Sequence, residues 1–256
     1  MIIPTKNSAP MLRRLIDSIR VQNIENIEVI VVDNYSSDET SEIATASGVK
    51  FFSAGPERSS QRNFGALIAQ YDVLLFIDSD MELSDGIIRE CIIGIEHSDA
   101  LCLREVISAG KDFWGRVRAF ERASYFMSTY FEAARCIKKE VFSEVGGYDT
   151  ALTGLEDMAL QARLLRNRAR IGWVNAPLIH HEESLTLMHY LRKRERYGKT
   201  DRVFASLYPE FWRVLRSPTK RLCFAMRYLI NSKEFSLIGF LFGLMFLRII
   251  EVIIRS

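Results

Sequence analysis

Residues 71–80 read YDVLLFIDSD, an apolar run that ends in two aspartates separated by one serine. A continuous apolar run of this length is typical of a strand buried on both faces of a sheet. Residues i and i+2 of a strand share a face, so Asp78 and Asp80 are expected to converge on one site. In open parallel sheets, ligands bind beyond the carboxyl ends of the strands. The stretch therefore predicts an α/β sheet with a ligand site at the end of this strand.

The segments before residue 71 alternate between strand and helix patterns. The predicted strands are short apolar runs at residues 1–4, 28–32 and 49–52. The predicted helices lie at residues 11–20, where apolar residues recur at helical spacing, at 37–46, which starts with Ser and Asp, and at 58–69. Downstream, similar patterns predict helices near 83–96 and 157–166, strands near 100–106 and 172–175, and a partly helical stretch at 112–135. Strands that alternate with helices predict a mostly parallel sheet flanked by crossover helices.

The net charge of +2 over 256 residues conceals a basic segment. Residues 189–233 contain 12 Lys or Arg but only 3 Asp or Glu, and Leu, Phe and Trp are interleaved with them. Basic residues mixed with large apolar ones are typical of interfacial helices. This composition favours an anionic membrane surface as partner over nucleic acid.

An apolar segment follows at Phe235–Ile254, interrupted only by glycines, Ser236, Arg248 and Glu251. A helix of this length is roughly 30 Å long, about the thickness of a bilayer core. Arg248 and Glu251 are three residues apart and could pair on it. The segment predicts a C-terminal membrane-associated helix, which either spans the bilayer or lies at its interface.

The start of the chain and its cysteines predict the compartment. MIIPTK lacks the basic and apolar regions of a secretory signal. The four cysteines are far apart and have no metal-site or redox spacing, so we expect ordinary core residues in a reducing setting. We expect a membrane-associated protein whose catalytic domain faces the cytoplasm.

Four charged residues in or near these elements each have a functional and a structural interpretation. Asp78 and Asp80 suit a hard ion such as Mg²⁺ or Mn²⁺ that also binds phosphate oxygens, although an isolated Asp-x-Asp is more often a solvated turn. Asp33 follows EVIVV at 28–32 and could accept a hydrogen bond from a nucleobase, or cap a helix within residues 33–38. Arg62 could bind a diphosphate or lie on a solvated helix face.

Six motifs in a fixed order resemble family 2 of the inverting glycosyltransferases, which have a GT-A (Rossmann-like) fold. They are IPTKN at 3–7, VVDNxSxD at 31–38, RNxG at 62–65, DxD at 78–80, GGYD at 146–149 and GLED at 154–157. The resemblance covers roughly residues 1–185. It implies a catalytic domain over 1–185, which basic amphipathic helices at 186–233 and the apolar helix at 234–256 would follow.

The resemblance also implies a role for each motif residue. Pro4, Thr5 and Asp33 would border the nucleoside of a UDP- or GDP-sugar, with Arg62 beside them. Asp78 and Asp80 would hold the ribose and a Mn²⁺ or Mg²⁺ ion. Asp157 would be the catalytic base, and Glu156 would support the acceptor site or orient the base. The structural alternative for Asp157 is a charge in the first turn of a helix.

This set of residues suits inverting transfer, a single displacement at the anomeric carbon. A divalent ion offsets the charge that develops on the nucleoside diphosphate as it leaves. A carboxylate on the opposite face takes the proton of the incoming hydroxyl. We therefore expect a hydroxyl acceptor, on a lipid-linked saccharide or another glycan, and the alternative is a polyprenyl-phosphate glycosyl synthase similar to dolichyl-phosphate mannose synthase.

A histidine pair offers a third metal ligand. His180 and His181 follow the strand predicted at 172–175, and the segment resembles an Ile-x-His-x-Glu segment of membrane-proximal relatives, which selects His181. Imidazole is an acceptable ligand for Mn²⁺. The alternative is an unliganded pair in a surface loop.

Two departures from the family pattern limit the assignment. Membrane-bound synthases that extend polymers carry Gln-x-x-Arg-Trp, whereas this chain has KRERY at 193–197, which argues against a processive polymerase. Asp33 is followed by Asn-Tyr where the family often has Asp-Gly, so base recognition is expected to be atypical.

Three other functions fit the sequence less well. A Rossmann dehydrogenase would carry Gly-x-Gly-x-x-Gly after the first strand, and a sugar nucleotidyltransferase would carry a glycine-rich loop there, where this chain has PTKN at 4–7. A non-catalytic membrane-bound protein has no reason to keep Asp78, Asp80 and Asp157 together.

Overall fold

The computed structural model describes residues 1–182, 186–233 and 235–255. The chain forms two compact units, each built from two separate stretches of sequence. The first unit comprises Met1–Arg104 and Ala133–Ile179, and the second comprises Glu105–Glu132 and His180–Ser256.

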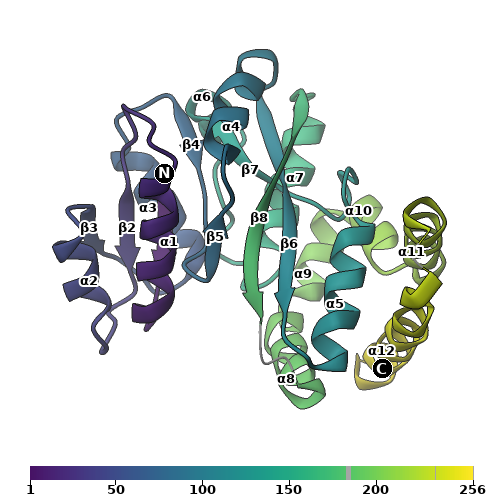
Figure 1. The fold of residues 1–256 in the computed structure, drawn as a ribbon. Coiled ribbons are helices and arrows are strands. Elements are labelled where there is room, and N and C mark those ends of the chain that lie inside the picture. The colour runs from purple at the N-terminus through teal and green to yellow at the C-terminus, as the bar shows by residue number, and fades with distance from the viewer. Residues whose placement is uncertain (183–185, 234, 256) are drawn as a thin grey trace. The chain divides into compact units, whose positions relative to one another are not determined.

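The first unit opens with a three-stranded parallel sheet in the order β1-β2-β3 (Figure 1). Its strands are β1 (Ile2–Thr5), β2 (Ile30–Asp33) and β3 (Lys50–Ser53). The helices between and after them are α1 (Ala9–Val21), α2 (Thr40–Ala46) and α3 (Arg58–Ile68). The three strands are in register, so that Thr5 pairs with Asp33 and Asp33 with Ser53. The predicted alternation of parallel strands and helices is confirmed here.

The second sheet corrects the prediction of a mostly parallel arrangement. It has five strands in the order β4-β7-β6-β8-β5, and β7 is antiparallel to both β4 and β6. The strands are β4 (Val73–Leu75), β5 (Met81–Leu83), β6 (Ala100–Ala109), β7 (Ala134–Lys138) and β8 (Ile171–Glu182). The sheet is therefore mixed, because strand direction depends on the path of the connections and not on the apolar pattern of each strand.

Residues that follow β4 join the two sheets. Phe76 forms an isolated parallel bridge with Ile2, and the Ile77 amide donates to the Ile2 carbonyl at 3.1 Å. The stretch 71–77 thus pairs first with β7 and then with β1. This places Asp78 directly beyond a strand position that lies beside β1.

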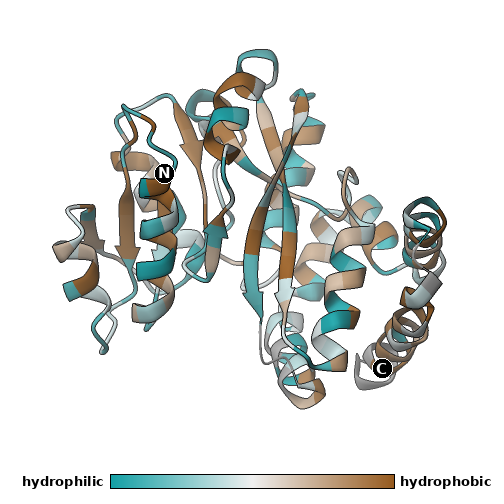
Figure 2. Ribbon diagram, in the orientation of Figure 1, coloured by the Kyte–Doolittle hydropathy of each residue, from teal (hydrophilic) through white to brown (hydrophobic). Residues whose placement is uncertain are grey.

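Apolar residues of β1 and β2 point alternately to two cores. Ile3 and Val31 pack with α1, whereas Ile2, Ile30 and Val32 pack on the side of α3, and all five are fully buried. In Figure 2, β2 and β4 are brown, the colour of hydrophobic residues. Burial on both faces explains the continuous apolar runs of these strands. The remaining helices of this unit are α4 (Ile87–His97), α6 (Lys139–Glu144) and α7 (Glu156–Arg166).

The second unit is mainly helical, and its core joins residues far apart in the sequence. Its helices are α5 (Phe113–Ser124), α8 (Leu187–Gly198), α9 (Asp201–Leu207), α10 (Pro209–Leu215), α11 (Pro218–Ser232), the 3₁₀ turn η1 (Phe235–Leu237) and α12 (Ile238–Arg255). Val117 and Phe120 of α5 pack with Ala225 of α11 and with Leu241 and Leu244 of α12. The compact units therefore differ from the predicted contiguous segments 1–185, 186–233 and 234–256, because the last helices need α5 to complete their core.

One side of the apolar C-terminal helix α12 packs inside the second unit. Among the described residues, no helix is long and apolar enough to cross a membrane, so the predicted span is not supported. Leu244 and Leu247 of α12 are 2% and 1% exposed because they face α5 and α11. Much of the apolar character of the segment therefore serves packing within the protein. The predicted pairing of Arg248 with Glu251 involves a side chain outside the described set, and Arg248 binds Glu121 of α5.

The cysteines differ from the prediction at one position. Cys91, Cys102 and Cys136 are buried, as expected of core residues, whereas Cys223 on α11 is exposed.

Candidate active site

The ends of β1 and β2 bring together the residues expected to border a nucleoside. Thr5 and Asp33 are paired in register at the carboxyl ends of these strands, and they are 4% and 3% exposed. The Gln61 amide of α3 donates to the carbonyls of Thr5, at 2.9 Å, and Val32, at 2.6 Å. Gln61 thereby holds the two strand ends together. Pro4 is buried one position earlier in β1.

Asp33 uses its carboxylate to close a turn. Its Oδ2 accepts a hydrogen bond from the Ser36 amide at 2.7 Å, and its Oδ1 accepts one from the Ser36 hydroxyl. The alternative that a residue of 33–38 is the N-cap of the next helix is wrong, since the N-cap residue of α2 is Glu39. The turn fixes the backbone that leaves β2, and the expected contact of Asp33 with a base stays a prediction.

Arg62 lies in a buried ion-pair network and not on a solvated helix face. Its Nη2 donates to Oδ1 of Asp78, its Nη1 donates to Oε1 of Glu156 at 3.2 Å, and its guanidinium lies 4.9 Å from the ring centroid of Tyr148. Burial lowers the pKa of Arg62, but Asp78, Tyr148 and Glu156 outweigh burial and raise it. Arg62 therefore stays charged and joins a strand end to the start of α7.

The two aspartates of the Asp-x-Asp motif differ in their surroundings. The second oxygen of Asp78, Oδ2, accepts a hydrogen bond from Nη1 of Arg135 at 3.2 Å. Burial raises the pKa of Asp78, but the positive charges of Arg62, Arg135 and Arg58 outweigh burial and hold it well below its usual range. Asp80 lies two residues further on and is half-buried. Asp78 is thus held by two arginines, one from α3 and one from β7.

The first turn of α7 presents a second carboxylate pair. Glu156 is 5% exposed and also accepts an ion pair from Nη2 of Arg58 at 3.1 Å. Burial and the charge of Asp157 raise the pKa of Glu156, against the opposing effect of Arg58 and Arg62. The Asp157 side chain is exposed, and its Oδ1 accepts a hydrogen bond from the Met158 amide at 2.8 Å. Asp157 thus makes a first-turn contact and still presents its carboxylate to solvent.

The Arg-Asn-x-Gly and Gly-Gly-Tyr-Asp motifs contact each other. The Asn63 side chain accepts from the amide of Tyr148 and donates to its carbonyl, both at 2.8 Å. Gly147 has a φ of +63°, and a Cβ there would lie 2.8 Å from Oδ1 of Asn63. Glycine is therefore needed at 147 for both conformation and space. The two motifs together position Tyr148 beside Arg62.

The histidine pair lies in a strand and not in a surface loop. β8 extends to Glu182, well beyond the predicted strand at 172–175, because its residues pair within the five-stranded sheet. His180 Nδ1 lies 2.9 Å from Oε1 of Glu105, so the structure assigns a protein partner to His180. His181 is half-buried and belongs to the second unit, whereas Asp80 belongs to the first. His181 as a metal ligand stays a prediction.

Residues 1–151 match the sequence model of glycosyl transferase family 2. This chain belongs to glycosyl transferase family 2. The match includes the Asp33, Arg62 and Asp78–Asp80 motifs and stops before Glu156 and Asp157.

Two curated proteins that are similar to this family 2 chain are named as glycosyltransferases. The pre-mycofactocin glycosyltransferase of Mycobacterium tuberculosis is 24% identical over 82% of this chain and 48% of its own length. The O-antigen chain rhamnosyltransferase RfbN of Salmonella typhimurium is 26% identical over 73% of this chain and 67% of its own length. The family 2 chain thus spans about half the length of the first of these relatives.

A solved structure shows the same fold. The mannosyltransferase PcManGT from Pyrobaculum calidifontis, in complex with GDP-Man and Mn²⁺, superimposes with a TM-score of 0.66 at 16% identity. The superposition covers 98% of this chain and 85% of that one. The fold of the family 2 chain is therefore GT-A-like, with a mixed sheet and flanking helices.

The acidic residues of this family 2 site suit a metal that arrives with a phosphorylated ligand. In the described part of the chain, no three His, Cys, Asp or Glu side chains gather in a metal-binding arrangement. Mg²⁺ sites at nucleotides commonly use one or two carboxylates and take their other ligands from phosphates and water. Asp80 is a carboxylate of the kind that such a site uses, and both oxygens of Asp78 accept hydrogen bonds from arginines.

Three residues that complete this network were missed at the sequence level. Arg58 and Arg135 supply positive charge to Glu156 and Asp78, and Tyr148 packs against Arg62. Arg58 could have been found from the sequence, since it lies one helical turn before Arg62 on α3 and residues at that spacing share a helix face. Arg135 could not, because it reaches Asp78 only through the pairing of β7 with β4.

The opposite pKa shifts of Asp78 and Glu156 predict losses of stability of different size when each is replaced by its neutral isostere. Asp78→Asn removes one of the two buried anions that Arg62 binds and the carboxylate that Arg135 binds, and we expect it to lower the free energy of unfolding by about 3 kcal/mol at pH 7. Glu156→Gln removes a charge that burial disfavours, and we expect a loss below about 1 kcal/mol. Urea unfolding of the two isosteric variants measures both values, and equal losses would contradict the assignment.

The lowered pKa of Asp78 also makes the free energy of unfolding depend on pH. Its pKa is depressed in the folded state, so its contribution is complete above the pKa of an unfolded Asp, about 3.9. The stability advantage of the wild type over Asp78→Asn should be constant from pH 7 to about pH 5 and should shrink below about pH 4. An advantage that grows as the pH falls would contradict this sign.

Proposed function

We propose that this chain is an inverting, metal-dependent glycosyltransferase that moves a sugar from a nucleoside-diphosphate sugar to a hydroxyl of a lipid-linked saccharide. The observation that carries the proposal is the Asp78–Arg62–Glu156 bridge. It ties the strand end that leads to Asp80 to the helix that presents Asp157. The donor-side and acceptor-side carboxylates thus sit on one connected framework within the first unit.

Each residue of this framework has a role in the proposed reaction. Thr5 and Asp33 border the nucleoside at the ends of β1 and β2. Asp80 would hold a Mn²⁺ or Mg²⁺ ion, and such an ion would supply positive charge to the diphosphate leaving group. Asp157 accepts the proton of the attacking hydroxyl.

Arg62 and Glu156 act as positioning residues in this scheme. The buried Arg62 guanidinium holds Asp78 and Glu156 at fixed places, which keeps the Asp-x-Asp turn and the α7 start in register. Glu156 lies next to Asp157 in the chain, and burial and the negative charge of Asp157 raise the pKa of Glu156.

The donor is proposed to be a UDP- or GDP-sugar. The GDP-Man and Mn²⁺ in the complex of PcManGT support a nucleotide sugar and a divalent ion here. The name of RfbN, which refers to an O-antigen chain, supports a saccharide acceptor. The test is a screen of UDP- and GDP-sugar hydrolysis by the full chain, with Mn²⁺ present. Hydrolysis of one donor class above the no-enzyme rate is the expected result, and none from any donor would contradict the proposal.

We also propose that the chain attaches to an anionic membrane surface, with its catalytic unit on the cytoplasmic side. Large apolar side chains on the outer side of α12 support it, since Phe242, Phe246 and Ile249 are 65%, 47% and 58% exposed. The basic helices at 186–233 add attraction to anionic lipid, each cation near the surface contributing about 1 kcal/mol.

We expect Phe242→Glu to release the full chain from vesicles of phosphatidylglycerol and phosphatidylcholine, because it places a charge on the exposed side of α12. Vesicle co-sedimentation at low and high salt measures the effect. Deletion of 231–256 is a poor test, because Leu241 and Leu244 complete the core of the second unit. Unchanged co-sedimentation of Phe242→Glu would contradict this mode of attachment.

A further inference from the structure

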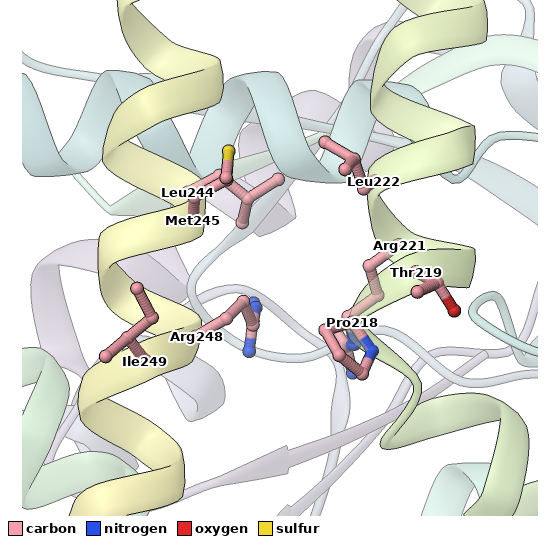
Figure 3. A pocket seen from close by; sticks show the side chains of 8 residues that line it. All are labelled: Pro218, Thr219, Arg221, Leu222, Leu244, Met245, Arg248 and Ile249. Carbon is pink, nitrogen blue, oxygen red and sulfur yellow. The ribbon is translucent and has the colours of Figure 1, made fainter.

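A groove of about 360 Å³ lies between α11 and α12, entirely within the second unit. This volume is within the range of small-molecule sites. Its walls are mainly apolar and include Leu222, Leu244, Met245 and Ile249, and two arginines, Arg221 and Arg248, also line it. Figure 3 shows Arg248 extending from α12 and Leu222 from α11 into the space between the helices.

The two arginines share one buried counter-ion. Glu121 of α5 is fully buried, and its Oε1 accepts hydrogen bonds from Arg221 at 2.9 Å, from Arg248, and from the Tyr125 hydroxyl at 2.7 Å. Its Oε2 accepts one from Arg118. Burial raises the pKa of Glu121, but the three arginines outweigh burial and hold it well below its usual range. Glu121 thus stays ionised and binds Arg118, Arg221 and Arg248.

Hydrogen bonds to three protein groups hold the Arg221 guanidinium in place beside the groove. Its Nε donates to the Leu215 carbonyl at 2.7 Å, and its Nη1 donates to Glu121 and to the Tyr125 hydroxyl, both at 2.9 Å. Its side chain is 14% exposed, at the groove. A guanidinium already fixed by other contacts loses little conformational entropy when it binds a ligand.

The groove therefore joins cationic groups to an apolar surface that continues to solvent. Met245 is 42% exposed and Ile249 is 58% exposed, so the apolar wall extends outward from the arginines along α12. A small hydrated anion gains nothing from such a wall, whereas an amphiphile gains from both parts. Arginine favours phosphate through paired hydrogen bonds.

We propose that this groove binds a lipid with a phosphate head group. The phosphate oxygens accept hydrogen bonds from Arg221 and Arg248, and the chain lies against Leu222, Leu244, Met245 and Ile249. The proposal deepens the membrane attachment proposed above and does not depend on transferase activity. It assigns to the second unit a specific lipid site in addition to general attraction to a charged surface.

The test uses the full chain and water-soluble lipids, so that it is independent of vesicle attachment. Calorimetry measures binding of dihexanoyl phosphatidic acid, dihexanoyl phosphatidylcholine and inorganic phosphate, the lipids below their micelle concentrations. We expect phosphatidic acid to bind at least about tenfold more tightly than either other probe, since it alone has both an uncompensated anionic head and a chain. Equal affinity for the two lipids would overturn the proposal, and so would inorganic phosphate that binds as tightly as phosphatidic acid.

Matched variants locate the site. Met245→Asp puts a negative charge in the groove, and Met226→Asp puts one on α11 outside the groove lining at a similar exposure, 39% against 42%. We expect Met245→Asp to weaken phosphatidic acid binding at least about tenfold and Met226→Asp by less than about twofold, because only the former removes apolar contact and repels the head group. Equal effects of the two variants would overturn the proposal. Arg221→Gln, checked for an intact thermal transition, should also weaken phosphatidic acid binding without affecting phosphatidylcholine.

Discussion

Asp157→Asn should retain nucleotide-sugar binding and slow sugar transfer by at least about a hundredfold. A sugar hydroxyl has a high pKa, so its proton must be removed as the new bond forms. Asn keeps the oxygen that accepts the hydrogen bond of the Met158 amide, so the first turn of α7 should stay in place. The variant therefore removes the basic oxygen and leaves the local structure unchanged.

Calorimetry of donor binding and a transfer assay, on the same preparation, separate the two effects. Asp17→Asn is the matched control, because the Asp17 side chain is 61% exposed on α1 and pairs only locally with Arg20. The control should transfer sugar at the wild-type rate. A polyprenyl phosphate is already ionised near neutral pH and needs no base. If Asp157→Asn glycosylates such an acceptor at the wild-type rate, the enzyme is a polyprenyl-phosphate glycosyl synthase and the hydroxyl-acceptor proposal fails.

Asp80→Ala should abolish metal-dependent transfer, a loss of about a thousandfold or more, while the fold stays intact. Asp80 is half-buried beyond a strand end, so truncation leaves no large cavity. The loss is expected because the diphosphate would leave without its compensating positive charge. Titration of Mn²⁺ and Mg²⁺ against the transfer rate measures it, with circular dichroism as the check on folding.

Asp85→Ala serves as the control, because Asp85 is an exposed aspartate five residues further along. It should respond to metal as the wild type does. Turnover of the wild type at full rate in excess chelator would contradict the metal requirement. For His181→Ala we expect a higher metal concentration at half-maximal rate, and an unchanged value would remove His181 from the proposed ligand set.

The strands β1 to β4 could be predicted because their signals are local. Runs such as EVIVV and YDVLLFI are buried on both faces, and this burial is visible as continuous apolar sequence. The carboxylates Asp33 and Asp78 could be placed at strand ends for the same reason, since polar residues mark where each run stops. The strands β5 and β7 had no such signal, because MEL at 81–83 and ARCIK at 134–138 are short and interrupted by charge.

The C-terminal helix shows the limit of reading apolar content along one segment. Phe235–Ile254 has a composition that suits lipid, yet Leu241, Leu244 and Leu247 pack against α5, more than 100 residues earlier in the sequence. Composition records how much apolar surface a helix has but not which neighbour covers it. The exposed side of α12 could be identified only after its partners were known.

The sequence by itself determined the family, the α/β alternation of the first 80 residues and the acidic positions Asp33, Asp78, Asp80, Glu156 and Asp157. These follow from residue type and short spacing. Only the tertiary structure decided that Arg62 and Arg135 both hold Asp78, and that Arg221 and Arg248 share Glu121. Ion pairs between residues 16 to 127 positions apart depend on the path of the whole chain, and no local pattern records that path.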